Sequence, residues 1–383
     1  MDFQLTPAQS DLRELARTWV DKEVVPYAAQ WDRDESVDPA IVGKLGALGF
    51  LGIGIAEQYG GSGGDTFDYC LLLEELGRGD SAVRGIVSVS LGLFGKSIAA
   101  YGTEEQKQRF LPGICAGEQL GCFALTEPGT GSDAANLDTR AVRDGSDWVL
   151  SGTKIFITNG TWADHALVFA RTGGPGPKGV TAFVVPTDAP GFGRTEIKGK
   201  LGLRGQATAE FVLDRVRVPD ALRLGEEGQG FRIAMSALDK GRIGVASGCV
   251  GVARACLEAA VRYAGEREQF GKPIAGYQLV QELLSDIAVA TDAARLLAWR
   301  AADLADRGEA FGTAASMAKL FASEAAVSAA NNAIQVFGGY GYIDEYPVAK
   351  YLRDARVLTL YEGTSQIQKL LIGRALTGVN AIV

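Results

Sequence analysis

The sequence predicts an α+β protein, mostly α, with an N-terminal helical domain, a central β-domain of barrel or sandwich type, and a C-terminal four-helix bundle. Apolar residues recur at helical spacing up to about residue 118. Short segments rich in β-branched and aromatic residues then follow, separated by turn formers. Helical periodicity returns in long segments without internal proline. We expect domains at 1–118, 119–225 and 226–383.

The N-terminal domain is expected to consist of helices punctuated by glycine. In "TPAQSDLRELARTWVDKEVV", Thr6 is a candidate N-cap and Pro7 takes the first helical position. "TFDYCLLLEELGR" and "GIVSVSLGLFGKSIAAYG" are segments of the same kind. The second is apolar nearly all round, which predicts a deeply buried helix.

The β-domain is expected to contain five clear strands. They are "GCFALT", "WVLSGTKIFITNG", "DHALVFART", "GVTAFVVPT" and "AEFVLDRVRVP", with turn formers such as Asp144–Gly145 between them. After "LGEEGQG", long helices are predicted at 229–264, 276–308, 311–337 and 351–376. Four helices of this kind most simply form an antiparallel bundle.

Composition excludes several classes of function. A net charge of −8, with scattered basic residues, opposes binding to nucleic acid or an anionic membrane. The longest uncharged run, 325–343, is too polar to span a bilayer, and the N-terminus does not resemble a signal peptide. Five cysteines without a CxxC pattern are expected to be buried thiols in a reducing compartment, so we expect a cytoplasmic protein. With His165 as its one histidine, the chain is not expected to bind a metal.

The stretch "FALTEPGTGSDAANL" could carry chemistry. It offers backbone N–H groups and the Thr126 and Ser132 hydroxyls, which suit the polar edge of a flat heteroaromatic ligand. Residues 129–134 formally fit GxGxxA, but the chain continues into a strand rather than a helix, which argues against a Rossmann loop. An ordinary strand-to-turn connection is the alternative.

In "KIFITNG", Phe156 and Thr158 lie two residues apart and therefore on one face of a strand. An aromatic plate beside a hydroxyl could hold a flavin ring, and a core phenylalanine is the alternative. In "EREQFGKPIAGYQ", Arg267 could bind a pyrophosphate bidentately beside Gln269 and Phe270. A solvated loop between helices is the alternative there.

Two further features stand out near the C-terminus. "QVFGGYGYIDEYPVAKYLRDA" closes a helix with Gly338–Gly339, which lets a second backbone approach closely. "TLYEGTSQIQKLLIGRAL" places Glu362 between apolar segments, beside Tyr361 and Gly363. An acid there stands at the joint between two buried segments, although a helix-end charge is the alternative. His165 is expected to be structural, because no nucleophile motif lies near it.

Seven motifs in order resemble the acyl-CoA dehydrogenase family, flavoenzymes that introduce a double bond between Cα and Cβ of an acyl thioester. They are "ALTEPGTGSD", "KIFITNG", "LDKGRIGVA", "REQFGKPI", "QVFGGYGY", "YPVAKYLRDA" and "YEGTSQIQ". "SDWVLSGTK", "ARLLAWRAA" and "SMAKLFASEAA" are most similar to short-chain and isobutyryl-type members. The resemblance implies conversion of a short-chain acyl-CoA, straight or branched, to the trans-2-enoyl-CoA, with specificity set by 86–100 and 235–250.

The resemblance also implies roles for individual residues. Glu362 would remove the α-proton while hydride leaves Cβ for flavin N5. Residues implied to contact FAD are Phe123, Leu125, Thr126, Ser132, Phe156, Ile157, Thr158, Arg267, Phe270, Gln278, Gln335, Gly338, Gly339, Thr364 and Gln366. Residues implied to contact the substrate are Ser132, Asp239, Arg242, Tyr361 and Gly363. Many family members carry Trp where Phe156 stands, a departure that could change the exposure of the flavin ring.

The resemblance implies a homo-oligomer, and a tetramer in particular, because the residues around Arg267 and Gln335–Gly339 would hold the cofactor of a neighbouring subunit. An electron-transfer flavoprotein is the implied acceptor. A non-catalytic CoA- or flavin-binding protein is the alternative from another class. Among enzymes, an acyl-CoA oxidase and a dehydrogenase of carrier-protein thioesters remain open.

Overall fold

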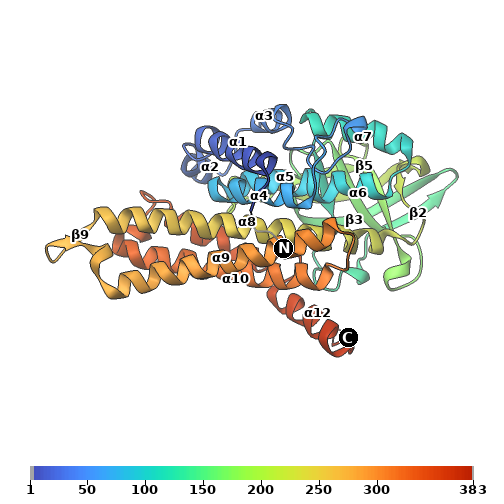
Figure 1. Cartoon of the computed structure of the whole chain (residues 1–383). Helices are drawn as coiled ribbons and strands as arrows, with labels where there is room; N and C mark the ends of the chain where they lie inside the picture. The colour runs from blue at the N-terminus through green and yellow to red at the C-terminus, as the bar shows by residue number, and fades with distance from the viewer. Residues whose placement is uncertain (1–3, 382–383) are drawn as a thin grey trace.

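The computed structural model describes residues 4–381, in which the N-terminal helices pack beside a sheet at one end and a long helical bundle extends toward the other (Figure 1). The N-terminal helices are α1 (Pro7–Glu23), α2 (Ala28–Asp34), α3 (Ile41–Ala47), α4 (Thr66–Gly79), α5 (Ser81–Val87), α6 (Lys96–Tyr101) and α7 (Glu104–Ala116). The predicted start of α1 is confirmed, because the Thr6 and Gln9 side chains cap each other's backbone N–H groups at 3.2 Å and 3.0 Å. The fold class is confirmed as well.

The apolar segment after α5 is buried as predicted, but it is not one regular α-helix. Residues Ser88–Gly95 form a π-helical segment, η2, between α5 and α6. Ser90 within η2 accepts a hydrogen bond from the Gly121 N–H at 3.1 Å, which ties η2 to the first strand. π-Helical turns are rare and often mark functional sites.

The sheet contains eight connected strands. They are β1 (Gly121–Ala124), β2 (Arg140–Asp144), β3 (Asp147–Thr158), β4 (His165–Arg171), β5 (Val180–Pro186), β6 (Phe192–Glu196), β7 (Thr208–Pro219) and β8 (Arg223–Leu224). Their order is β6-β7-β3-β2-β4-β5-β8, and β1 pairs in parallel with β4. The sequence analysis missed β6, whose mostly exposed "FGRTE" lacks apolar alternation.

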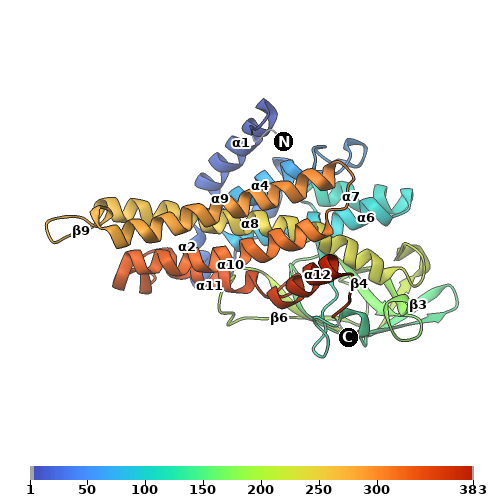
Figure 2. The same cartoon turned by 60° about the horizontal axis from the view of Figure 1, so that its bottom comes forward.

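The C-terminal part contains α8 (Gly230–Glu266), α9 (Gln278–Asp306), α10 (Gly312–Phe337), α11 (Val348–Leu358) and α12 (Ser365–Thr377). A short hairpin of β9 (Glu268–Gln269) and β10 (Lys272–Pro273) joins α8 to α9 at the far tip of the bundle. Figure 2 shows α8, α9 and α10 running side by side. The shorter α11 packs against α10 and α8.

The single helix predicted at 351–376 is wrong. The chain breaks between α11 and α12, because Glu362 and Gly363 have positive φ angles of 52° and 93°. A right-handed helix cannot contain such residues. Thr364 then caps α12 by accepting a hydrogen bond from the Ile367 N–H at 3.2 Å. The break places the glutamate in a turn rather than on a helix face.

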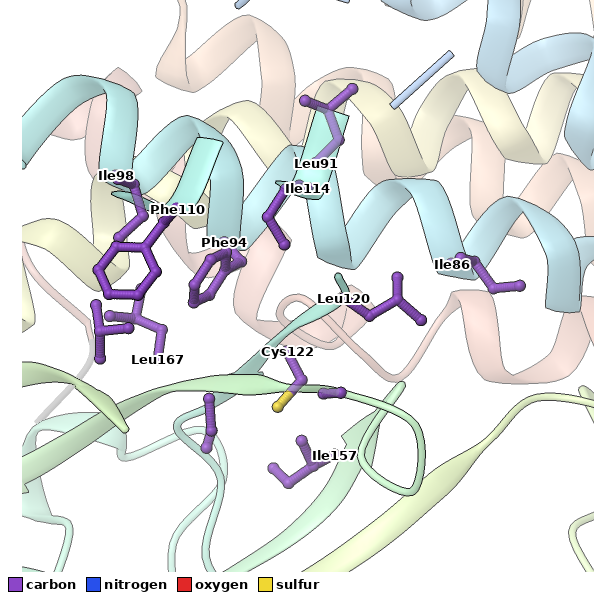
Figure 3. Packing of buried hydrophobic residues seen from close by; sticks show 14 of the residues in the cluster. Ile86, Leu91, Phe94, Ile98, Phe110, Ile114, Leu120, Cys122, Ile157 and Leu167 are labelled. Carbon is purple, nitrogen blue, oxygen red and sulfur yellow. The ribbon is translucent and has the colours of Figure 1, made fainter. Parts of the chain in front are cut away.

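The N-terminal helices and the sheet share one hydrophobic core. In Figure 3, Phe94 and Phe110 from the helices face Leu120, Cys122 and Leu167 from the strand region. The bundle has a separate core rich in alanine, which allows its helices to pack closely. All five cysteines are buried and free, as the sequence predicted.

A buried charge network joins the N-terminal helices to the bundle. Arg254 on α8 donates to Glu74 and Glu75 on α4 at 2.7 Å and 2.5 Å, and Arg295 on α9 donates to Glu74 at 3.0 Å. A pocket of about 390 Å³ lies beside this network. Because buried ion pairs require defined geometry, the network favours one orientation of α8 against the N-terminal helices.

Two helical stretches, 81–101 and 230–266, have the length and apolar character of membrane spans. Within them, 89% and 78% of the most apolar window is buried inside the protein, as in core helices. Over residues 4–381, no group of three or more His, Cys, Asp or Glu side chains is arranged to hold a metal ion.

Candidate active site

The turn around Glu362 is held by side chains from three helices. Arg242 on α8 donates to the Glu362 carbonyl at 3.3 Å, and Gln368 on α12 donates to the same oxygen at 3.1 Å. Lys319 on α10 donates to the Gly363 carbonyl at 2.8 Å. A left-handed glutamate is strained, so these donors offset the cost of holding it. The turn is therefore built to present the Glu362 side chain in one direction.

The Oε2 atom of the Glu362 carboxylate is inaccessible to solvent and has no hydrogen-bond partner within the described chain. Burial raises the pKa of Glu362 to about 6, against the opposing charges of Arg84, Lys319 and Arg242. The group is thus a carboxylate at neutral pH with an unused lone pair, which is what a general base requires.

Close approach of α8 to this carboxylate depends on Gly241. A Cβ atom at this position would lie 2.3 Å from Glu362 Oε2 and 3.1 Å from the Leu93 side chain of η2. Any larger residue would displace the carboxylate or η2. Gly241 lies within the motif "LDKGRIGVA", but the sequence analysis singled out only its charged neighbours.

Four residues implied to contact the substrate lie at or near the Glu362 turn, namely Asp239, Arg242, Tyr361 and Gly363. Arg242 is 6% exposed and donates to Asp239 at 2.5 Å. Burial raises the pKa of Asp239, although Arg242 opposes this effect. The Tyr361 hydroxyl accepts a hydrogen bond from Arg84 at 2.5 Å. These residues and Gly363 converge on one turn, with Asp239 acting on it through Arg242.

Two residues next to the turn point elsewhere. The Thr364 hydroxyl is used in capping α12, and Gln366 is exposed on the first turn of that helix. Neither side chain forms a hydrogen bond with the Oε2 atom of Glu362.

On the sheet, Phe156 is the most prominent exposed residue implied to contact FAD. Its ring is 65% exposed and its φ is 60°, at the bulge between Lys154 and Ile157 in the pairing of β3 with β7. The bulge turns Ile157 into the core, where it is 2% exposed and lies near Cys122 (Figure 3). The side chain of Ile157 is therefore buried, so a contact of this residue with FAD would have to use its backbone. Thr158 donates to Gln206 at 3.3 Å.

The other sheet residues differ in their exposure. Phe123 is partly buried and packs on Phe169, with ring centroids 4.8 Å apart. Leu125 is 8% exposed, and its carbonyl accepts from Lys154 at 3.1 Å. The Thr126 carbonyl accepts from the Ile155 N–H at 2.9 Å. Ser132 is exposed in the following loop, so its hydroxyl is open to a ligand.

A groove of about 530 Å³ lies at the tip of the bundle. It is lined by Tyr263, Arg267, Gln269, Ile274, Val336, Phe337, Gly338, Gly339, Tyr340 and Ile343. The Arg267 guanidinium lies 5.7 Å from the centre of the Tyr340 ring. The structure therefore brings Arg267 together with the Gly338–Gly339 pair, although they are far apart in sequence.

Three more tip residues are exposed. Phe270 is 96% exposed and has a φ of 51°, and Gln278 and Gln335 are exposed as well. An almost fully exposed phenylalanine held in a left-handed conformation is costly in water, which favours burial against a partner or ligand.

Within one chain, the tip groove cannot meet the Glu362 turn. Gly241 contacts the Glu362 carboxylate, whereas Arg267 follows the last residue of the same helix. At about 1.5 Å per residue, the two positions are about 39 Å apart. Figure 1 shows the β9 hairpin and the sheet at opposite ends of the molecule. The implied FAD residues thus form two separate sets.

The sequence analysis missed Arg84, Lys319 and Gly241. Arg84 and Lys319 are 2% and 0% exposed, and both lie close enough to Glu362 to affect its pKa. A lone cation in the apolar segment "SAVRGIV", or in an alanine-rich helix, is the signal that could have drawn attention to them.

Comparisons with known proteins cover each part of the chain. Family models described as "Acyl-CoA dehydrogenase" match residues 6–118 (N-terminal domain), 122–216 (middle domain) and 228–377 (C-terminal domain). The short-chain specific acyl-CoA dehydrogenase of Homo sapiens mitochondria is 44% identical over 370 residues, which is 96% of this chain and 90% of that protein.

Two solved structures are similar over nearly the whole chain. Butyryl-CoA dehydrogenase from Megasphaera elsdenii has a TM-score of 0.96 and 41% identity, covering 98% of this chain and 100% of that one. Glutaryl-CoA dehydrogenase from Mycobacterium smegmatis, in complex with FADH2, has a TM-score of 0.95 and 39% identity, covering 99% and 97%.

Proposed function

The chain belongs to the acyl-CoA dehydrogenase family and is therefore an oxidoreductase, and from this premise we propose that it dehydrogenates a short-chain acyl-CoA to the trans-2-enoyl-CoA with Glu362 as the base. The observation that carries this proposal is the Glu362 carboxylate, which is held in a strained turn and whose Oε2 atom has no hydrogen-bond partner among the described residues. A non-catalytic binding protein would have no need of such an arrangement.

Acyl-CoA dehydrogenases are FAD-dependent, and residues of this chain suit that cofactor. The exposed ring of Phe156 offers an apolar plate to a flat ring system, and the nearby Thr158 hydroxyl, which donates to Gln206, offers an acceptor. The exposed guanidinium of Arg267 beside the Gly338–Gly339 backbone suits a pyrophosphate. When bound, FAD supplies the chemistry of accepting the hydride from Cβ.

Proton removal is the part of the reaction that this chain performs itself. The Cα proton of a thioester is only weakly acidic, so the base must be positioned against it. Glu362 takes that proton on Oε2, which has no competing hydrogen bond. Arg242, Gln368 and Lys319 hold the backbone of the turn while the side chain changes charge.

We propose a homo-oligomer, and a tetramer in particular, in which the tip groove of one subunit completes the cofactor site of another. The separation of about 39 Å along α8 supports this arrangement. So do exposed apolar residues near the tip, which include Phe270 at 96% and Tyr342 at 85% exposure. An electron-transfer flavoprotein is the proposed acceptor, and the free, buried cysteines support a reducing compartment such as the cytoplasm.

The names of the relatives do not identify the acyl group of this protein's substrate. One solved structure is named for butyryl-CoA, whose chain ends in a methyl group, and another for glutaryl-CoA, whose chain ends in a carboxylate. Similarity is nearly the same for both. We propose a short acyl chain of about four to six carbons, because each further buried CH₂ adds about 0.8 kcal/mol only where it fits.

Anaerobic mixing with acyl-CoAs of graded length tests this proposal. The purified protein should be yellow with about one FAD per chain, and its flavin should be bleached fastest by short acyl-CoAs. Fast oxygen consumption would indicate an oxidase, and a strict need for a carrier-protein thioester would indicate the other alternative. A colourless protein, or an optimum at long chains, would contradict the proposal.

A further inference from the structure

Arg84 on α5 is buried beside the residue that precedes the base. Its side chain is 2% exposed and is among the largest fully buried side chains of the described chain. One terminal nitrogen donates to the Ser88 hydroxyl at 2.9 Å, and the other donates to the Tyr361 hydroxyl at 2.5 Å. The Nε atom is buried and has no partner. Arg84 thus has neutral oxygen partners and one unused donor.

Among residues 4–381, no carboxylate forms a hydrogen bond with Arg84. Asp80, the acid nearest in sequence, caps α5 through the Ala82 N–H at 2.6 Å and binds Lys350 at 2.7 Å. Its negative charge is therefore already paired. A buried guanidinium without a hydrogen-bonded anion recovers less of its desolvation cost than one that forms an ion pair.

Most of the other buried cations in residues 4–381 do have a carboxylate partner. Arg78, Lys154, Arg242 and Lys350 each bind at least one carboxylate. Lys319 binds a carbonyl, and burial lowers its pKa to about 8, so it can lose its charge readily. Arginine cannot relieve its burial in this way, because it remains protonated in proteins.

Three of the groups around Arg84 carry no charge that could pair with it. Burial raises the pKa values of Tyr69, Tyr361 and Cys249, so all three are neutral at neutral pH. Glu362 is the acid whose charge interacts with Arg84, and Arg84 is the strongest of the cations that lower its pKa. The two side chains are not hydrogen-bonded to each other, since the terminal nitrogens of Arg84 bind Ser88 and Tyr361 and its Nε has no partner. Arg84 and the base therefore belong to one site, in which Arg84 has no hydrogen-bonded anion.

We propose that the acyl group of the substrate ends in a carboxylate and that Arg84, with the Ser88 and Tyr361 hydroxyls, binds that carboxylate. This inference rests on the dehydrogenation proposed above and narrows its substrate to the CoA monothioester of a short dicarboxylic acid. A guanidinium matches a carboxylate in geometry and charge. An acyl chain ending in a methyl group would leave Arg84 unpaired in a site from which water is excluded.

Matched pairs of CoA thioesters test the inference. The pairs are succinyl and butyryl, glutaryl and valeryl, and adipyl and hexanoyl, which differ only in a terminal carboxylate or methyl group. In wild-type holoenzyme, the rate of flavin reduction at low substrate should favour the carboxylate at one length or more by on the order of 10²-fold. If the methyl-ended member is preferred at all three lengths, the inference is wrong.

Variants then assign the preference to Arg84. Arg84→Met should remove the preference or invert it, whereas Arg84→Lys should keep part of it. Arg254→Met is the matched control, because Arg254 is also a largely buried arginine but pairs with Glu74 and Glu75 away from the base. It should keep the wild-type ratio. A carboxylate preference that is unchanged in Arg84→Met would overturn the role of Arg84.

Two further measurements distinguish a variant that fails to fold from a wrong inference, and a wrong inference from a wrong proposed function. If Arg84→Met does not fold with its flavin, equilibrium binding to the Glu362→Gln holoenzyme decides the question, since this protein should bind the thioesters without consuming them. Tighter binding of the carboxylate member, weakened by Ser88→Ala, supports the inference, and equal binding refutes it. If no thioester of either kind reduces the wild-type flavin, the proposed function itself fails.

Discussion

Replacing Glu362 with Gln tests the base directly, because the change keeps the size of the side chain and removes its basic oxygen. The flavin colour should persist while reduction by acyl-CoA falls steeply. Loss of a positioned general base typically costs about 10²–10⁴-fold in rate. Stopped-flow absorbance under anaerobic conditions measures the effect.

The pH dependence of the same reaction follows from the burial of the carboxylate. Because the pKa of Glu362 is raised to about 6, about one tenth of the enzyme has an ionised base at pH 5 and about nine tenths at pH 7. The wild-type rate at low substrate should therefore rise about tenfold over this range. The Gln variant should show no such rise.

Stability should change in the opposite direction from activity. The pKa of Glu362 is higher in the folded protein, at about 6, than its ordinary value of 4.5. The contribution of Glu362 to the free energy of unfolding is therefore fully present below pH 4.5 and is lost as the pH rises through 6. The difference between the two pKa values corresponds to about 2 kcal/mol. The Glu362→Gln variant should therefore be more stable than wild type by up to this amount at pH 8 and equally stable near pH 4, as measured by thermal unfolding.

Glu127→Gln is the matched control for stability. The Glu127 carboxylate is buried, which raises its pKa, but Lys154 at 2.7 Å more than offsets this and lowers the pKa overall. The Glu127→Gln variant should therefore be less stable than wild type at pH 8.

If Glu362→Gln reduced its flavin at nearly the wild-type rate and with the same pH profile, the base would have to be another residue.

Two other substitutions test how the turn around Glu362 is held and how the cofactor site is completed. Lys319→Met removes the donor to the Gly363 carbonyl and a positive charge that lowers the pKa of Glu362, so the rise of the reaction rate with pH should move to higher pH. In this variant kcat should fall more than KM changes, and Lys319→Arg should restore part of the rate. An unchanged pH profile would show that Lys319 has only a structural role. Arg267→Ala should weaken FAD retention and subunit association together, as measured by flavin content and sedimentation; full flavin content in an unchanged oligomer would contradict the shared cofactor site.

Much of the fold could be predicted because its signals are local. The Thr6 cap and Pro7 mark the start of α1, and apolar alternation marks the longer strands. Where the local signal is weak, the prediction failed. The exposed strand β6 has no alternating pattern, and the break between α11 and α12 depends on the conformation of Glu362 and Gly363 rather than on helix propensity.

The sequence by itself determined the helical and β parts of this protein and the identity of its candidate base, because periodicity, caps and short motifs depend on neighbouring residues. Only the tertiary structure decided what surrounds that base. Gly241 touches Glu362, and Arg84 lacks a carboxylate partner, through contacts between residues more than 100 positions apart. Burial and the pairing of charges arise from such distant contacts, so the raised pKa of Glu362 and the unpaired Arg84 could not be seen in the sequence.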